Sequence, residues 1–175
     1  MKLFDAYKIA DKIKAELAPM CERIEIAGSL RRGRPEVNDI DFVILPKPGQ
    51  MDAIKARCEK KCHVVKDGEQ NYIVRLPSYG GGGGGFQVDI FFARPAVKDL
   101  LQTVPGNWGS LLLCRTGSTA HNIYLVEHAK SRGFTWNPYK GVLDAEGYVI
   151  ASETEEEIFD MLALEFVPPA NRERQ

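Results

Sequence analysis

The sequence of 175 residues has no apolar run long enough to cross a membrane, and it contains few cysteines and histidines. Its first residues, Met1-Lys2-Leu3-Phe4-Asp5, lack the apolar stretch of a secretory signal, so we expect a cytoplasmic protein with no membrane partner. In a reducing compartment the four cysteines should stay free thiols. No zinc site is expected at Cys58 and Cys62, because no second pair of ligands accompanies them.

The sequence has no overall excess of positive charge, because its formal net charge is -1, so it lacks the strongly basic composition typical of many nucleic-acid-binding proteins. The charge is unevenly distributed: residues 1–100 hold 17 Lys and Arg against 14 Asp and Glu, whereas residues 101–175 hold 6 against 10. We therefore expect a positive working face in the first part. Binding to nucleic acid should be modest and sensitive to salt.

Three aspartates carry the strongest functional signal. Asp39 and Asp41 lie two residues apart in an apolar segment, so in a strand their side chains leave the same face, while Ile40 and Phe42 face the core. Asp89 stands in a second apolar segment. Clustered carboxylates repel one another, and their hard oxygen atoms suit Mg²⁺. If the two segments are neighbouring strands, the three aspartates form a two-metal site for nucleotidyl transfer.

A turn that contains glycine precedes the aspartates. Gly28 and Ser29 follow the short alternating segment 24–27 and precede an expected helical turn. Backbone N–H groups and the Ser29 hydroxyl would meet a triphosphate where this helix begins. Arg31 and Arg32 follow, but adjacent side chains diverge, so at most one of them should reach the phosphates.

The apolar pattern and the chain breakers predict an α+β fold in two parts, residues 1–100 and 101–175. The first part should hold a mixed or antiparallel sheet with helices on one face, and the second should be a small α/β subdomain. The expected elements are a helix with Ala6, Ala10, Ile13 and Leu17 on one side, strands near 24–27 and 40–45, a helix over 52–61, a hairpin of 63–66 and 71–76 with a tight Asp67-Gly68 turn, and a helix over 120–132.

Several polar and glycine-rich features are expected to be structural. Thr154 and Glu157 have the spacing of a capping box, so the acids Glu155 to Glu157 belong to a first helical turn rather than to a metal site. His121 and His128 are expected on the surface or partly packed, without a chemical role. The run Gly80 to Gly85 should form a mobile turn at the end of the sheet.

Taken in order, these motifs resemble those of the X family of DNA polymerases, typified by polymerase beta, within the nucleotidyltransferase superfamily. The resemblance covers nearly the whole chain. It is carried by Gly28-Ser29-x-Arg31-Arg32-Gly33, Asp39-x-Asp41, Val88-Asp89-Ile90, Thr116-Gly117-Ser118-Thr119-Ala120-His121-Asn122, Gly133-Phe134-Thr135-Trp136-Asn137-Pro138-Tyr139, Glu153-Thr154-Glu155-Glu156-Glu157-Ile158-Phe159 and Val167-Pro168-Pro169.

The resemblance implies a template-directed DNA polymerase that depends on two Mg²⁺ ions, with Mn²⁺ as a substitute, and that fills short gaps during repair. Its partners would be dNTP and primer-template or gapped DNA, and we expect a monomer. The first part would be a nucleotidyltransferase palm, and the second would select the nucleotide and contact DNA. Such an arrangement is similar to compact polymerases of some viruses and phages, so the cell would be prokaryotic or a viral or phage host.

The family's residue roles carry over to matching positions. Asp39 and Asp41 would bind both metal ions, while Asp89 would bind the catalytic ion and accept the proton of the primer 3′-hydroxyl. Asn122 would reach the minor-groove edge of the incoming base. The other implied nucleotide-binding residues are Gly28, Ser29, Arg32 and Asn38, which lie near the phosphates, and Thr116, Gly117 and Ser118, whose backbone lies along the sugar.

Some positions depart from the family pattern. Only one helix and one strand precede Gly28, so no lyase domain with its DNA clamps is expected, and synthesis should be distributive. Cys114 and Arg115 replace a Tyr-Phe pair beside the sugar, Val126 stands where an Arg commonly touches the template, and Gln87 replaces an Arg.

Two other functions fit parts of the sequence. One is a nucleotidyltransferase that acts without a template, or on RNA, a protein or a small molecule. The second-part motifs and the short 66–71 hairpin connection count against it. The other is a nucleic-acid-binding module without catalysis, which three clustered acids would weaken by repelling DNA.

Overall fold

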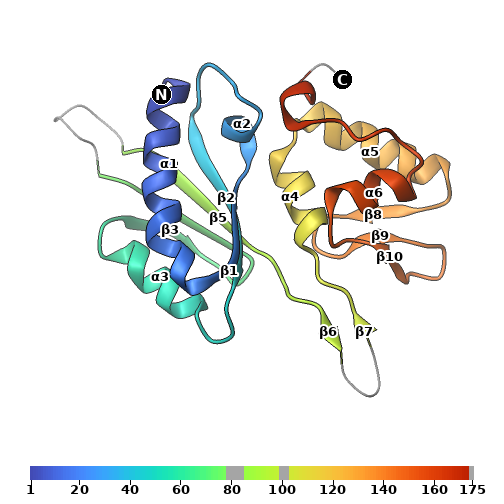
Figure 1. Cartoon of the computed structure of the whole chain (residues 1–175), viewed down its shortest axis with the longest axis horizontal. Helices are drawn as coiled ribbons and strands as arrows, with labels where there is room; N and C mark the ends of the chain where they lie inside the picture. Colours follow the sequence, from blue (N-terminus) through green and yellow to red (C-terminus); the bar gives the residue numbers. More distant parts are fainter. Residues whose placement is uncertain (78–84, 99–102, 174–175) are drawn as a thin grey trace. The chain divides into compact units, whose positions relative to one another are not determined.

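A computed structural model describes residues 1–77, 85–98 and 103–173, and the chain forms two compact units, Met1–Phe92 and Ala93–Gln175 (Figure 1). The boundary between the two parts was predicted near residue 100. Residues 93–98 instead belong to the second unit, because the Arg94 backbone N–H donates to the Asn107 side-chain oxygen at 2.7 Å and the Asn107 N–H returns a bond to the Arg94 carbonyl at 3.2 Å. Two short strands, β6 (Val97–Lys98) and β7 (Thr103–Val104), pair just beyond.

The first unit is built on a mixed sheet of five strands in the order β1-β2-β5-β4-β3. Only the central β2–β5 pair is parallel, and the other three neighbouring pairs are antiparallel. The strands are β1 (Cys21–Ile26), β2 (Asp39–Pro46), β3 (His63–Asp67), β4 (Asn71–Arg75) and β5 (Gln87–Phe92). The α+β class and the mixed sheet expected from the sequence are therefore present.

Helices α1 (Leu3–Leu17) and α3 (Met51–Glu59) cover one face of this sheet (Figure 1). Apolar residues recur on α1 at helical spacing and alternate along the strands, so one stripe of the helix meets one face of the sheet. The fully buried residues of this core include Ala6, Ala10, Ile40, Phe42, Ile44, Ile54, Tyr72 and Ile90. A 3₁₀ turn over Ala18–Met20 ends α1, and the four-residue helix α2 (Gly28–Arg31) lies between β1 and β2.

The β3–β4 hairpin forms, but the prediction of a tight Asp67-Gly68 turn is wrong. Asp67 is the last residue of β3 and pairs with Tyr72, so the connection spans residues 68–70. The Asp67 carboxylate accepts a hydrogen bond from the Lys55 ammonium of α3 at 2.5 Å. Because Asp67 pairs within the ladder, the turn lies further along the chain than the Asp-Gly pair.

The second unit combines a three-stranded antiparallel sheet, in the order β10-β9-β8, with three helices. Its elements are α4 (Trp108–Thr116), α5 (Thr119–Ser131), β8 (Thr135–Asn137), β9 (Gly141–Leu143), β10 (Val149–Ala151), α6 (Glu155–Met161) and a 3₁₀ turn over Pro169–Asn171. A separate core, which includes Leu113, Leu125, Trp136, Ile158 and Phe159, holds them together. The predicted helix over 120–132 and the predicted capping box are both confirmed.

Other predictions concern single residue types. The predicted mobile turn at Gly80 to Gly85 falls, except for Gly85, outside the described residues. All four cysteines are free thiols, as expected. Within the three described ranges, no helix is both long and apolar enough to span a bilayer.

Replacing Thr154 with Ala should lower the free energy of unfolding by about 1 kcal/mol, because the Thr154 hydroxyl accepts the Glu157 backbone N–H at 3.0 Å and starts α6. Urea denaturation followed by circular dichroism measures the change. Thr119→Ala is the matched control, since Thr119 is exposed and α5 is capped by Ser118 instead. Equal stabilities of the two variants would show that the cap contributes nothing.

Candidate active site

The strand register brings the three aspartates to one face of the first unit's sheet. Asp41 of β2 is the direct partner of Asp89 in the parallel neighbour β5, and Asp39 lies two residues before Asp41. Residues paired across a ladder share a face, as do residues two apart in one strand. All three are half-buried, whereas the alternate residues Ile40 and Val88 are 0% and 1% exposed and pack toward the helices.

Gln87 lies on the same face and contacts Asp89. Its side-chain Nε2 donates to the Asp89 Oδ1 at 2.8 Å, and its register partner in β2 is Asp39. Gln87 is thus adjacent to Asp39 across the ladder and hydrogen-bonded to Asp89 within its own strand. The two-residue spacing between Gln87 and Asp89 in one strand is the sequence signal for this shared face.

The donor set suits a hard divalent cation, because it offers only carboxylate oxygens from neighbouring strands. In the described residues, no three His, Cys, Asp or Glu side chains are gathered closely enough to form a ready-made metal site. Metal binding at the aspartates would therefore require their carboxylates to turn toward one ion. The Gln87 bond to Asp89 is one contact that such a movement would change.

The predicted phosphate turn lies directly against Asp41. The Ala27 N–H donates to the Asp41 carbonyl at 2.8 Å and extends the β1–β2 ladder up to the start of α2. Gly28 follows with a positive φ of 60°, and a Cβ built on it would overlap the Asp41 carboxylate. Glycine is thus required here both by the backbone conformation and by the close approach.

The remaining predicted residues of the first unit lie in this turn or directly before β2. Ser29 is half-buried, and its carbonyl accepts the Arg34 N–H at 3.1 Å. Arg32 ends α2, where its N–H donates to the Gly28 carbonyl at 3.2 Å, and its side chain is half-exposed. Asn38 is exposed and directly precedes β2.

The second unit holds the other predicted nucleotide-binding residues in the turn between α4 and α5. Thr116 is the last residue of α4 and is buried, Gly117 has a positive φ of 69°, and the Gly117-Ser118 peptide bond is cis. The Ser118 hydroxyl caps α5 by accepting the His121 N–H at 3.3 Å. Asn122 donates from Nδ2 to the Cys114 carbonyl at 2.8 Å, while its Oδ1 has no hydrogen-bond partner within the described residues.

A buried ion pair between Arg172 and Glu155 lies next to this turn, and it could not be predicted from the sequence. Arg172 is fully buried and donates from its guanidinium to Glu155 at 2.7 Å and to the Val167 carbonyl at 2.9 Å. The Arg172 carbonyl accepts the Ser118 hydroxyl at 2.7 Å. Glu155 is 5% exposed, so this first-turn acid neutralises a buried cation as well as starting a helix.

The expectation that His121 lies at the surface or is partly packed is wrong, because His121 is completely buried. Its ring packs 5.9 Å from that of Phe159, and neither ring nitrogen has a hydrogen-bond partner in the described part of the chain. Burial lowers the pKa of His121 to about 4, with a further lowering from Arg172 that is opposed by Glu155. His128 is half-buried, and its ring contacts the Leu162 carbonyl at 3.0 Å.

The two residues that replace the family's aromatic pair are not interchangeable with it. Cys114 is half-buried in α4. Arg115 donates to the Tyr139 hydroxyl at 2.6 Å, and its guanidinium lies 5.6 Å from the centre of the Tyr139 ring. Arg115, which contacts Tyr139, therefore occupies a position at which the X family usually has an aromatic side chain.

One comparison with known proteins bears on the second unit. Residues 111–173 match the family model for the DNA polymerase beta thumb. The chain is thus related to polymerase beta-like proteins through this domain. The matched range includes the Thr116-Gly117-Ser118 turn, Asn122 and the Glu155–Arg172 pair, and it supports DNA polymerase and DNA-binding functions. No curated protein matches the chain.

Gly28→Ala should reduce both stability and any nucleotidyl transfer, because the added methyl group would overlap the Asp41 carboxylate. A positive φ alone makes alanine unfavourable by about 1 kcal/mol or more. Thermal unfolding and primer extension measure the two effects. Gly33→Ala is the control, since Gly33 also has a positive φ but an added Cβ there would meet nothing within 4 Å. Similar activity losses in both variants would argue against the contact with Asp41.

The stability of the second unit should fall as the pH drops from about 6.5 toward 4, because the unfolded chain then protonates His121 while the folded chain does not. Above the unfolded pKa, His121 is neutral in both states and has no such effect. His121→Leu should flatten this part of the pH profile, measured as the free energy of unfolding in urea against pH. His128→Leu is the matched control. An unchanged slope in His121→Leu would show that His121 does not titrate in this way.

Proposed function

We propose that this protein is a Mg²⁺-dependent, template-directed DNA polymerase of the X family, which adds deoxynucleotides to a primer 3′-hydroxyl and fills short gaps in repair. The observation that carries the proposal is the register of Asp41 opposite Asp89, with Asp39 on the same face. The match of residues 111–173 to the polymerase beta thumb adds independent support from the other unit.

Asp39, Asp41 and Asp89 would hold two magnesium ions. When bound, such ions neutralise phosphate charge and lower the pKa of a coordinated hydroxyl. The Asp89 carboxylate would accept the proton of the primer 3′-hydroxyl. In this scheme the protein positions and neutralises the reactants and forms no covalent intermediate with them.

The α2 turn would bind the triphosphate next to these carboxylates. Gly28 lets the backbone approach Asp41 closely, and Ser29 and Arg32 follow within the same helical turn. The Ser29 hydroxyl would donate to a phosphate oxygen, and the Arg32 guanidinium would pair with the phosphate charge. Asn38, which is exposed next to Asp39, would complete this group.

The α4–α5 turn would bind the sugar and the base of the incoming nucleotide. Asn122 donates from Nδ2 to the Cys114 carbonyl, so its side chain is already oriented before a base arrives. Its amide nitrogen, rather than its buried oxygen, would donate to the acceptor on the minor-groove edge of the base. Thr116, Gly117 and Ser118 would border the sugar. Arg115 is engaged with Tyr139, so discrimination against ribonucleotides would depend on this pair rather than on an aromatic residue of the turn.

One assay distinguishes the proposal from its alternatives. Purified protein is mixed with Mg²⁺ or Mn²⁺, dNTP and a labelled primer that is single-stranded, annealed to a template, or placed beside a one-nucleotide gap. Extension only on a template supports the proposal. Extension of the single strand would instead indicate a template-independent nucleotidyltransferase, and binding without extension would indicate a non-catalytic module.

Asp89→Asn should reduce incorporation by about a thousandfold or more, because it removes a metal ligand and proton acceptor while keeping the side-chain size. Single-turnover primer extension measures the rate, and circular dichroism checks the fold. Asp11→Asn, at an exposed position of α1, is the control and should extend primers at the wild-type rate. Wild-type activity in Asp89→Asn would refute the assignment of this residue.

A further inference from the structure

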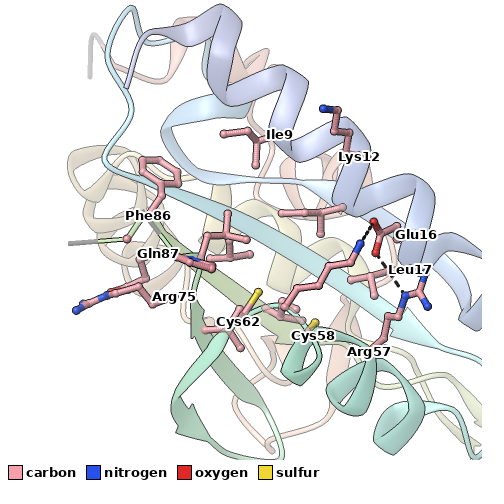
Figure 2. A pocket seen from close by; sticks show the side chains of 18 of the residues that line it. Ile9, Lys12, Glu16, Leu17, Arg57, Cys58, Cys62, Arg75, Phe86 and Gln87 are labelled. Atoms are coloured by element: carbon pink, nitrogen blue, oxygen red, sulfur yellow. Dashed lines mark hydrogen bonds and ion pairs between the residues drawn. The ribbon is translucent and has the colours of Figure 1, made fainter. Parts of the chain in front are cut away.

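A pocket of about 1040 Å³ is lined by residues of α1, α3, β4 and β5 (Figure 2), and Gln87, which contacts Asp89, reaches its edge. Its walls carry half-exposed apolar side chains, namely Ile9, Ile13, Cys62, Leu76 and Phe86. Val88 and Ile90 of β5 lie at its base. An apolar space of this size that the described residues leave open is a feature of binding sites rather than of ordinary cores.

The base of this pocket offers side chains but no free backbone groups. β4 and β5 are interior strands of the sheet, and their ladder continues past the strand ends, where the Leu76 N–H donates to the Phe86 carbonyl at 2.9 Å. An extended peptide could therefore add no strand here. A helix suits such a site, because it satisfies its own backbone and presents only side chains.

The rim of the pocket is positively charged. Among the described residues that line it, four are cationic, Lys12, Arg57, Lys61 and Arg75, whereas Glu16 alone is acidic. Glu16 of α1 pairs with Lys61 at 2.6 Å and with Arg57 at 3.4 Å, both from the α3 side (Figure 2). Two cations thus share one carboxylate, and the excess charge favours an anionic partner.

The volume of the pocket matches a short helical segment. A helix of about 10 Å diameter fills roughly 80 Å³ for each ångström of its length, so about 1040 Å³ corresponds to approximately two to three turns. We propose that the pocket between α1 and α3 docks the apolar face of an acidic amphipathic helix from a partner protein. Carboxylates of that helix would pair with Arg57 and Lys61 at the rim.

The first test measures binding of a defined probe, a fluorescein-labelled amphipathic peptide about 18 residues long, built from Leu, Ala and Glu with the Leu residues along one face. Arg57→Ala/Lys61→Ala should weaken binding by about tenfold in fluorescence anisotropy. Lys60→Ala/Lys66→Ala is the matched control, since both residues are exposed and neither lines the pocket. Neither variant changes an aspartate-face residue, so primer extension should be unaffected by both.

The second test uses the chain's own thiols. Cys62 lines the pocket and Cys114 belongs to the other unit, and both are half-buried. With peptide at about ten times its Kd, alkylation of Cys62 by N-ethylmaleimide should slow by about tenfold while that of Cys114 stays unchanged, as followed by mass spectrometry.

Any of four outcomes would overturn the proposal. The first three are that the acidic peptide does not bind, that a peptide with Lys in place of Glu binds as tightly, and that the acidic peptide does not protect Cys62 from alkylation. The fourth outcome is that palmitate or duplex DNA protects Cys62 in place of the peptide, which would make the pocket a lipid or nucleic-acid site. Because these readouts need no polymerase activity, they fail independently of the proposed function.

Discussion

The parallel pairing of β2 with β5 is the contact on which the candidate active site depends. Asp41 and Asp89 are far apart in the sequence, and no local turn brings them together. Their approach is set by the backbone ladder between two interior strands, which pairs Ile40 with Val88 and Phe42 with Ile90 on the opposite face. A slip of one residue would move Asp89 into the apolar core, so burial of the alternate residues fixes the register.

The same ladder explains why the two faces of the sheet have different chemistry. One face meets α1 and α3 and is apolar except at the rim of the pocket. The other face presents Asp39, Asp41, Gln87 and Asp89, and the Gly28 turn approaches it from the end of β1. The different residue types on the two faces follow directly from the two-residue period of a strand. A protein-docking site and a site of nucleotidyl transfer can therefore occupy one small sheet, and Asn38 and Gln87 border both of them.

Much of this arrangement could be predicted from the sequence because it depends on short-range patterns. The alternation around Asp39 and Asp41, the spacing of Ala6, Ala10 and Leu17, and the Thr154–Glu157 cap each lie within one element. Contacts between distant segments could not be predicted in this way. In the sequence, Glu155 looks like an ordinary first-turn acid, but its partner Arg172 lies in a different element. His121 looks solvent-exposed in the sequence, but its ring is buried and packs against Phe159 of α6. The Asp67-Gly68 turn failed because Asp67 pairs with Tyr72 across the ladder.

The Glu155–Arg172 pair also bears on how the second unit is completed during translation. Glu155 is synthesised before Arg172, and a carboxylate cannot be buried cheaply without its counter-charge. Burial of the Glu155 carboxylate in α6 is therefore unfavourable until Arg172 has been synthesised. Both central strands of the first unit precede Glu155 in the sequence, so its sheet can form before the second unit has its buried counter-charge.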